Sequence, residues 1–214
     1  MKDLYIIGSG GFGREVAWLV ERINGIRKEW DIRGFIDDNH SKHGNICGGY
    51  SILGDSNYLQ TIAKEKVIWV VCAVGNSKIR KEIIQRIEKN SNIKFATLVD
   101  PSAIYSKRIK IDEGSIICAG NIFTVDITIG KHVIVNLDCT IGHDSIIEDY
   151  VTIYPSVNVS GNVTVHACTE LGTGSKIIQG VYISGSTTLG AGAVVNKNIE
   201  ESGTYVGVPA RKIK

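Results

Sequence analysis

Paired cysteines, long apolar runs and a strong excess of one charge are all missing from this sequence. Its five cysteines are odd in number and show no C-x-x-C spacing, which argues against a disulfide framework or a zinc site. The longest apolar run, Val67 to Val74, is too short to cross a bilayer, so no membrane partner is expected. The net charge of +2, without a basic cluster before the last few residues, excludes nucleic acid as a partner. Because Met1 leads directly into a strand instead of a signal peptide, we expect a cytoplasmic protein with reduced thiols.

What the sequence does have is a strict six-residue repeat. From Val99 to Val195 an aliphatic or aromatic residue returns at every sixth position, seventeen times in phase, and a mostly small or β-branched residue stands four positions after each. A period of six fits neither a helix nor a hairpin meander and is typical of a parallel β-helix. We expect one short strand per hexad, three hexads per triangular coil, and inward side chains stacked on their equivalents about 4.8 Å along the axis. Glycines directly after the aliphatic residue, such as Gly130 and Gly142, are predicted to form turns with positive φ.

A different pattern precedes the repeat. A short apolar strand over residues 4–7 runs into the glycine-rich turn of residues 8–13, and residues 14–20 suit an amphipathic helix. This order of strand, turn and helix is the context in which G-x-G-x-x-G brings phosphate to the amides of a helix N-terminus. The alternative is that the glycines only pack the helix against the strand.

The rest of this region alternates between strands and helices. The predicted elements are strands over residues 32–36, 67–74 and 94–98 and helices over residues 56–66 and 77–90. Ser77 is expected to cap the second of these helices, in which Ile79 and Ile83 share one apolar face with Ile84 and Ile87. Alternation of this kind predicts a parallel sheet. Asp37 and Asp38 follow the strand 32–36, where an acidic pair meets ribose, base or amino-sugar hydroxyls unless it only forms a turn.

Because the repeat begins only near Val99, we predict two rigidly joined domains. Residues 1–95 form an α/β, Rossmann-like domain, and residues 96–214 form the β-helix with its C-terminal tail. The first domain contains little more than one mononucleotide-binding half, whereas a dinucleotide fold needs two. A mononucleotide or nucleotide sugar is therefore the expected ligand, and a dehydrogenase is disfavoured.

One turn of the β-helix contains a candidate general base. His143 stands at the third hexad position, outside the core, with Asp144 beside it to fix the imidazole tautomer. Gly161 lies one coil further on, where its amide is able to hold an oxygen that becomes negative. His132 and His166 occupy other hexad positions, so the histidines do not stack into a metal site. Cys139 is at an inward position and is predicted to be a core residue; the alternative is that it acts as a nucleophile.

The hexads resemble those of the hexapeptide-repeat acyltransferases, whose β-helix is left-handed. The segment Val206 to Arg211 is similar to the G-x-P-A-[KR] segment that ends many of these enzymes beside coenzyme A. The resemblance implies that Arg211 and Lys212 bind coenzyme A phosphates, unless they are ordinary tail residues. A structural or carbonic-anhydrase-like β-helix is the alternative.

With the glycine-rich domain in front, nearly the whole chain resembles the NeuD/PglD-like family of bacterial nucleotide-amino-sugar N-acetyltransferases and sialic acid O-acetyltransferases. The resemblance implies a homotrimer with sites between subunits, acetyl-CoA as cosubstrate, no metal, and a His143–Asp144 catalytic pair with Gly161 as a main-chain donor. It also places Arg80 beside Gly75 and Asn76. Some relatives carry a second histidine where residues 150–153 here have none. The residues expected to bind the nucleotide sugar are Gly8, Ser9, Gly10, Gly11, Gly13, Arg14, Asp37, Asp38, Gly75, Asn76 and Asn136.

The sequence thus predicts N-acetylation of a nucleotide-linked amino sugar, a 4-amino-deoxy sugar, for bacterial surface glycan synthesis. Because the same base activates a hydroxyl, O-acetylation of sialic acid or another sugar is the nearest alternative. The alternative outside the enzymes is a non-catalytic protein that senses a nucleotide sugar.

Overall fold

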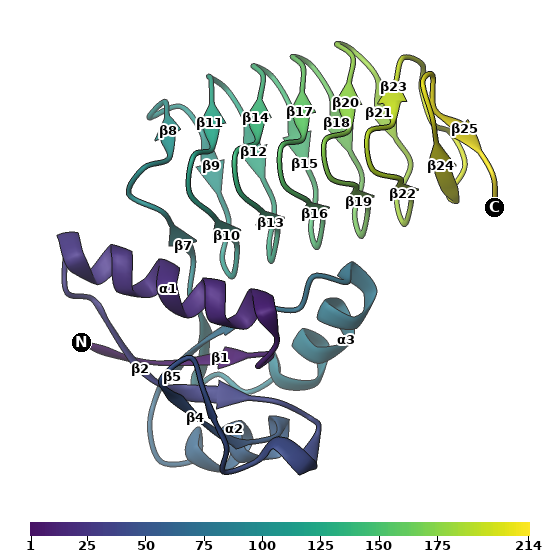
Figure 1. Ribbon diagram of the computed structural model, residues 1–214. Helices are drawn as coiled ribbons and strands as arrows, with labels where there is room; N and C mark the ends of the chain where they lie inside the picture. Colours follow the sequence, from purple (N-terminus) through teal and green to yellow (C-terminus); the bar gives the residue numbers. More distant parts are fainter.

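The computed structural model describes residues 1–214 as an α/β domain followed by a triangular β-helix (Figure 1). The six-stranded sheet of the first domain has the order β3-β4-β2-β1-β5-β6 and is parallel except for β3. Its strands are β1 (Lys2–Ile7), β2 (Trp30–Ile36), β3 (Ile46–Cys47), β4 (Tyr50–Gly54), β5 (Ile68–Cys72) and β6 (Ile93–Phe95). The helices are α1 (Gly11–Ile26), the 3-10 helix η1 (His40–Lys42), α2 (Ser56–Ile62) and α3 (Ser77–Ile87). None of the helices is long and apolar enough to span a membrane.

Several predicted element ends were wrong, each for a local reason. Helix α2 ends at Ile62 and α3 at Ile87, because polar turns follow both. Asn76, not Ser77, caps α3, because its side chain accepts a hydrogen bond from the Ile79 amide at 3.0 Å. Ile79 itself is half exposed, so the apolar face of α3 consists of Ile83, Ile84 and Ile87. The strand predicted over residues 94–98 is two strands, because Ala96 and Thr97 connect the α/β sheet to the first strand of the β-helix.

Apart from the last two strands of the first face, the three faces of the β-helix consist of two-residue strands that pair in parallel with strands eighteen residues away. The first face comprises β7 (Leu98–Val99), β10 (Ile116–Ile117), β13 (Ile134–Val135), β16 (Thr152–Ile153), β19 (Glu170–Leu171), β22 (Thr188–Leu189), β24 (Thr204–Val206) and the antiparallel β25 (Arg211–Lys212). The second face comprises β8 (Ile104–Tyr105), β11 (Ile122–Phe123), β14 (Thr140–Ile141), β17 (Asn158–Val159), β20 (Lys176–Ile177) and β23 (Val194–Val195). The third face comprises β9 (Lys110–Ile111), β12 (Thr128–Ile129), β15 (Ile146–Ile147), β18 (Thr164–Val165) and β21 (Tyr182–Ile183).

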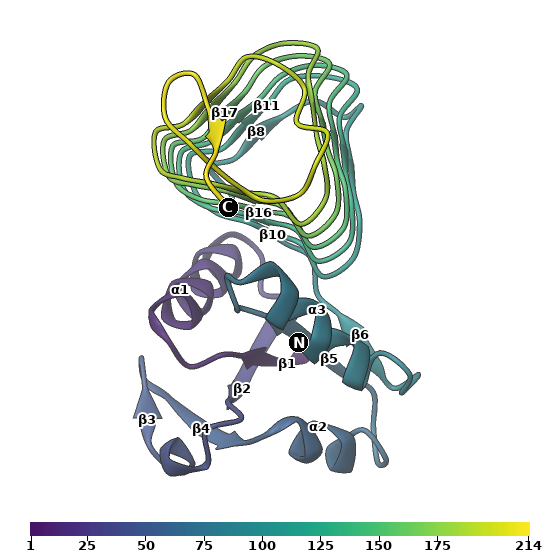
Figure 2. The ribbon, with the colours of Figure 1, turned by 90° about the vertical axis from the view of Figure 1, so that its right-hand side faces the viewer.

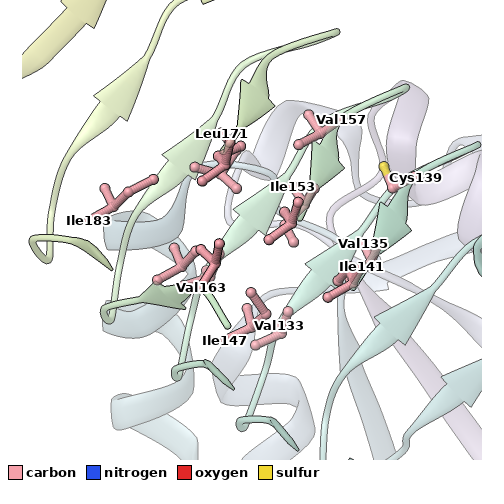
Figure 3. Close-up of a cluster of buried hydrophobic side chains, with 14 of the residues drawn as sticks. Val133, Val135, Cys139, Ile141, Ile147, Ile153, Val157, Val163, Leu171 and Ile183 are labelled. Atoms are coloured by element: carbon pink, nitrogen blue, oxygen red, sulfur yellow. The ribbon is translucent and has the colours of Figure 1, made fainter. Parts of the chain in front are cut away.

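The predicted inward residues form the core of the β-helix. A single buried cluster of 23 side chains runs from Ile117 to Ile199 and alternates the first and fifth hexad positions (Figure 3). Each aliphatic side chain therefore packs against its equivalents in the coils above and below. This stacking, with ladder hydrogen bonds between the coils, is what holds the repeats together.

The expected role of the turn glycines was wrong. Gly130 and Gly142 do not have positive φ; the left-handed residue comes two positions later, at His132 (φ 54°) and Asp144 (φ 60°). The glycines are needed because the next coil passes directly over them. A Cβ on Gly142 would lie 2.5 Å from the Gly161 nitrogen, and one on Gly130 would lie 2.5 Å from Asp149 Oδ1. The hexad thus requires glycine for close approach of backbones, not for its conformational freedom.

The α/β domain packs on the first face of the β-helix through α1 and α3 (Figure 2). Leu98, Ile116 and Ile134 point out of this face and belong to the same buried cluster as Val16 and Leu19 of α1. Beside this apolar contact, Arg22 of α1 donates to the buried carboxylate of Asp100 at 2.7 and 3.0 Å. Burial alone would raise the pKa of Asp100, but the hydrogen bonds from Arg22 and Ser102 lower it. This joint fixes how the two domains face each other.

The buried His132 makes this joint sensitive to acid. Its ring lies between Phe95 and Tyr150, and its Nδ1 has no hydrogen-bond partner in the chain. Burial lowers the pKa of His132 to about 4; Arg80 and Lys131 lower it further, and Glu113 opposes them.

We expect His132 to destabilise the fold between about pH 6.5 and 4. In that window the unfolded chain binds a proton that the folded chain does not, so the free energy of unfolding falls as the pH falls. Across this window the free energy of unfolding falls by about 3 kcal/mol in total. His132→Asn removes this titration, and asparagine tolerates the positive φ. Urea unfolding of both chains at pH 7 and pH 4 should show a much steeper acid loss in the wild type. Equal losses in the two chains would contradict this account.

Candidate active site

The glycine-rich turn leaves a row of backbone amides free at the carboxyl end of β1. Gly10 caps α1 without a side-chain hydrogen bond, and the first-turn amides of a helix have no acceptor within it. Cβ atoms on Gly10 and Gly11 would meet nothing within 4 Å, so this side of the loop is open. Gly8 has φ +98°, and a Cβ on Gly13 would collide with the Gly8 carbonyl. Gly8 and Gly13 therefore shape the turn, while Gly10 and Gly11 border the space that an anion would enter.

The neighbouring strand β5 adds a second pair of free amides. The N–H groups of Gly75 and Asn76 donate no hydrogen bond within the chain. Since β1 and β5 are adjacent and parallel, both loops lie at the same edge of the sheet. The Oδ1 atom of Asn76 accepts a hydrogen bond that caps α3, so the backbone N–H and the side-chain NH2 group of Asn76 remain for a ligand.

Asp37 and Asp38 lie at this edge in different environments. Asp37 accepts hydrogen bonds from the Ser9 amide and hydroxyl and from Lys42 Nζ. Burial alone would raise its pKa, but these bonds lower the pKa of Asp37 to about 2. Asp38 accepts from Arg86 Nη2 at 3.0 Å at the rim of a hollow of about 300 Å³. Asp37 thus braces the Ser9 loop as an anion, and Asp38 is the more accessible of the two.

Of the other two predicted binding residues, Arg14 is close to this edge and Asn136 is not. The exposed Arg14 on α1 extends beside Gly48 of the β3–β4 turn. Asn136 stands in the β-helix corner after β13, and its Oδ1 accepts a hydrogen bond from the Leu137 amide at 2.8 Å.

His143 and Asp144 occupy the corner between the second and third faces, just after β14. His143 Nδ1 lies 2.8 Å from Asp144 Oδ2, and both side chains are more than half exposed. Since a carboxylate only accepts, Nδ1 carries the proton and Nε2 is left as the free basic nitrogen. The positive φ of Asp144 turns its side chain back toward the histidine ring.

Gly161 lies against this imidazole, one coil further along. A Cβ on Gly161 would lie 2.6 Å from His143 Nε2, so only glycine leaves room for the ring. The Gly161 N–H donates no hydrogen bond within the chain. A free amide donor and a free imidazole nitrogen therefore stand side by side, as general-base chemistry at a carbonyl requires.

The same corner leads to a basic hollow near the C-terminus. The stacked positions at this corner are eighteen residues apart. After His143 and Gly161 they are Gln179 and Lys197. Lys197, Arg211 and Lys212 line a hollow of about 230 Å³. Lys197 lies three coils beyond His143, and because each coil advances about 4.8 Å along the axis, the hollow is about 14 Å from the histidine. Sequence reasoning missed Lys197, although counting on in steps of eighteen from His143 would have found it.

The His143 corner lies opposite the first face, on which the α/β domain packs (Figure 2). The glycine loop and His143 of one chain are therefore on different sides of the β-helix. Asn136 is at the other end of β14, on the corner nearer the α/β domain. A single chain does not bring all the predicted site residues together.

The alternative nucleophile and the other histidines fit structural roles better. Cys139 is buried in the core of the β-helix, and burial raises the pKa of its thiol to about 11. His166 pairs with Glu148 at 2.9 Å on a different corner, away from Gly161. No group of His, Cys, Asp or Glu side chains is arranged to hold a metal ion.

We expect Gly10→Val to weaken nucleotide-sugar binding selectively. The backbone of Gly10 (φ −77°) accepts a side chain without strain, and its Cβ would enter the open space beside the α1 amides. The KM for the nucleotide sugar should rise about tenfold or more, because a charge-assisted hydrogen bond is lost. The KM for acetyl-CoA should stay within twofold. Gly13→Val is no substitute, because the valine would collide with the Gly8 carbonyl and disturb the fold. Equal weakening of both substrates by Gly10→Val would contradict the assignment.

An α/β domain with an open glycine loop, joined to a hexapeptide β-helix with an exposed His–Asp pair, is the arrangement expected from the resemblance to the hexapeptide-repeat acyltransferases. Comparison with known proteins agrees. Residues 3–87 match the family model of the PglD N-terminal domain. The chain is 33% identical over 121 residues to UDP-N-acetylbacillosamine N-acetyltransferase of Bacillus subtilis (strain 168), which is 56% of this chain. It spans 52% of the length of that curated relative.

Two solved structures match almost the entire chain. The acetyltransferase domain of PglB from Neisseria gonorrhoeae FA1090 in complex with acetyl coenzyme A is 27% identical, with a TM-score of 0.88 over 99% of both chains. A mutant of perosamine N-acetyltransferase from Caulobacter crescentus, in complex with CoA and GDP-perosamine, has a TM-score of 0.90 and covers 100% of this chain and 98% of its own. At 23% identity this second likeness shows the fold. The predicted fold class, a Rossmann-like domain followed by a left-handed β-helix, is confirmed, and so is the resemblance to the nucleotide-amino-sugar N-acetyltransferases.

Proposed function

We propose that the protein transfers the acetyl group of acetyl-CoA to the amine of a nucleotide-linked amino sugar, a 4-amino-deoxy sugar used in bacterial surface glycans. The observation that carries this proposal is the position of His143 Nε2 beside the free Gly161 amide, on a β-helix that is joined to a glycine-rich loop of the kind that binds phosphate. The names of the relatives, which act on bacillosamine and perosamine derivatives, favour N-acetylation over the alternative of O-acetylation.

The reaction needs one base and one oxyanion donor. The sugar amine attacks the thioester carbonyl and passes a proton to His143 Nε2, while the Asp144 carboxylate stabilises the imidazolium. The Gly161 N–H donates to the oxygen as it becomes negative. The tetrahedral adduct collapses with cleavage of the carbon–sulfur bond, and the imidazolium returns its proton to the departing thiolate. No acyl-enzyme is formed, which agrees with the burial of Cys139.

The basic hollow fits the phosphate end of coenzyme A. An extended pantetheine arm spans about 15 Å, at about 3.5 Å for every three chain bonds. This length matches the three coil rises between His143 and the hollow that Lys197, Arg211 and Lys212 line. Arg211 and Lys197 have no ion-pair partner in the chain, so their charges are available for phosphate, whereas Lys212 is paired with Glu201.

We further propose a homotrimer whose sites form between neighbouring chains. The positions of the glycine loop and His143 on different sides of one β-helix support this, because one substrate must reach both. Closed threefold symmetry supplies three equivalent sites. We place the reaction in the cytoplasm; the five free thiols, four of them buried, support this placement.

Release of free thiol from acetyl-CoA tests the catalytic proposal. UDP-, GDP- and dTDP-linked 4-amino sugars are offered in turn, with free sialic acid as the O-acetylation substrate. Thiol release with an amino-sugar nucleotide alone supports the proposal, and release with sialic acid alone favours the O-acetyltransferase. Ligand binding without any thiol release would identify a nucleotide-sugar sensor.

A further inference from the structure

Arg80 is the largest fully buried side chain of the protein, and it forms no ion pair, although the charge of Glu170 acts on it from a distance. It lies on α3, at the joint between the two domains, and is 1% exposed. Burial lowers the pKa of Arg80 to about 10. A charge held this deep without a direct ion pair is costly unless its N–H groups are satisfied, so its contacts indicate what it is for.

All contacts of Arg80 are to carbonyl or hydroxyl oxygens, and they come from both domains. On the β-helix side, Nε donates to the His132 carbonyl at 2.9 Å, and Nη2 donates to the Tyr150 carbonyl at 2.7 Å and to Thr152 Oγ1 at 2.9 Å. On the α/β side, Nη1 donates to the carbonyls of Val74 at 2.7 Å and Gly75 at 3.0 Å. The guanidinium thus ties the loop after β5 to the coils of the β-helix.

Thr152 completes this tie from the β-helix. It is 1% exposed on the first face, and its hydroxyl donates to the Gly75 carbonyl at 2.6 Å while accepting from Arg80. The Gly75 carbonyl therefore has two donors, one from each domain.

The two donors fix the peptide between Gly75 and Asn76. Because a trans peptide is planar, its N–H points opposite to its carbonyl, and hence away from Thr152. This is the Asn76 N–H, which has no partner in the chain and lies at the same sheet edge as the free amides of α1.

We propose that Arg80 and Thr152 are positioning residues that orient the Gly75–Asn76 peptide, so that its N–H joins the α1 amides in binding the pyrophosphate of the nucleotide sugar. This inference rests on the proposed function and deepens it. It makes the β-helix part of the nucleotide site, since a hydroxyl of one domain sets the conformation of a phosphate-binding loop of the other.

Thr152→Val tests the proposal, because it removes the hydroxyl and keeps the shape of the side chain. Thr187→Val is the matched control: Thr187 is also fully buried in the β-helix, but its hydroxyl has no hydrogen-bond partner. Thr152→Ser restores the hydroxyl. The readouts are the Kd values of UDP, GDP and dTDP by calorimetry, the KM of each substrate, and the melting temperature.

For the nucleoside diphosphate that the wild type binds best, we expect Thr152→Val to raise the Kd about tenfold, the worth of one hydrogen bond to a charged group. The KM for acetyl-CoA should stay within twofold, Thr187→Val should bind normally, and Thr152→Ser should recover most of the affinity.

The proposal is overturned if Thr152→Val binds diphosphates within twofold of wild type, if Thr187→Val weakens binding equally, or if the wild type binds none. If the expected binding changes are seen but no amino-sugar nucleotide is acetylated, the positioning role stands and the proposed function fails.

Discussion

Replacing His143 with alanine is expected to lower kcat by about 10²–10⁴, with little change in the KM of either substrate. The imidazole takes the amine proton only as the carbon–nitrogen bond forms, so its loss affects the transition state more than substrate binding. Asp144→Asn should have a smaller effect, because Asp144 only orients the ring and stabilises its charged form. Rates are measured by thiol release with both substrates saturating.

His166→Ala is the matched control for His143→Ala. His166 is a partly exposed histidine that also has a carboxylate at 2.9 Å, but it stands on another corner without a free glycine amide beside it. Its replacement should leave kcat unchanged. Near-wild-type kcat in His143→Ala, or an acetylated Cys139 trapped by mass spectrometry, would refute direct transfer.

Two impaired variants are expected to regain activity when they are combined in one trimer. Gly10→Val impairs the nucleotide site and His143→Ala removes the base. If each site takes its glycine loop from one chain and its histidine from the neighbour, every closed trimer that contains both variants has one intact site in three. At a nucleotide-sugar concentration well below the wild-type KM, each variant alone should keep about a tenth or less of the wild-type rate.

The mixed trimers are prepared by co-expression of the two variants with different tags and purified through both tags. The double variant, co-expressed with itself, is the control, because its trimers contain no intact half-site. Light scattering checks that every preparation is trimeric. Failure of the mixed trimers to exceed the separate variants, or a fully active monomer, would contradict sites between chains.

The β-helix could be predicted from the sequence because its contacts are periodic. Every inward residue meets its equivalent eighteen positions away, so a one-dimensional pattern specifies the packing. His143, Asp144 and Gly161 follow from the same arithmetic, since two are adjacent in sequence and the third is one coil further on. The turn glycines were assigned the wrong role because approach of the next coil is a three-dimensional property that local turn statistics do not contain.

The joint between the domains could not be predicted in the same way. Arg80 was associated with Gly75 and Asn76 by resemblance, but its partners on the β-helix are far away in sequence and depend on how α3 packs on the first face. For the same reason, the sequence did not indicate that Thr152 reaches Gly75. It also did not separate Asp37, which braces the Ser9 loop, from the accessible Asp38.

The nature of the acetylated product tests the account most directly. The protein is incubated with acetyl-CoA and each nucleotide-linked 4-amino sugar, and the product is analysed by mass spectrometry before and after treatment with hydroxylamine, which cleaves esters and spares amides. The account predicts a nucleotide sugar that carries one acetyl group resistant to hydroxylamine. An acetyl group that hydroxylamine removes, or no acetylated sugar nucleotide with any of the three bases, would contradict it.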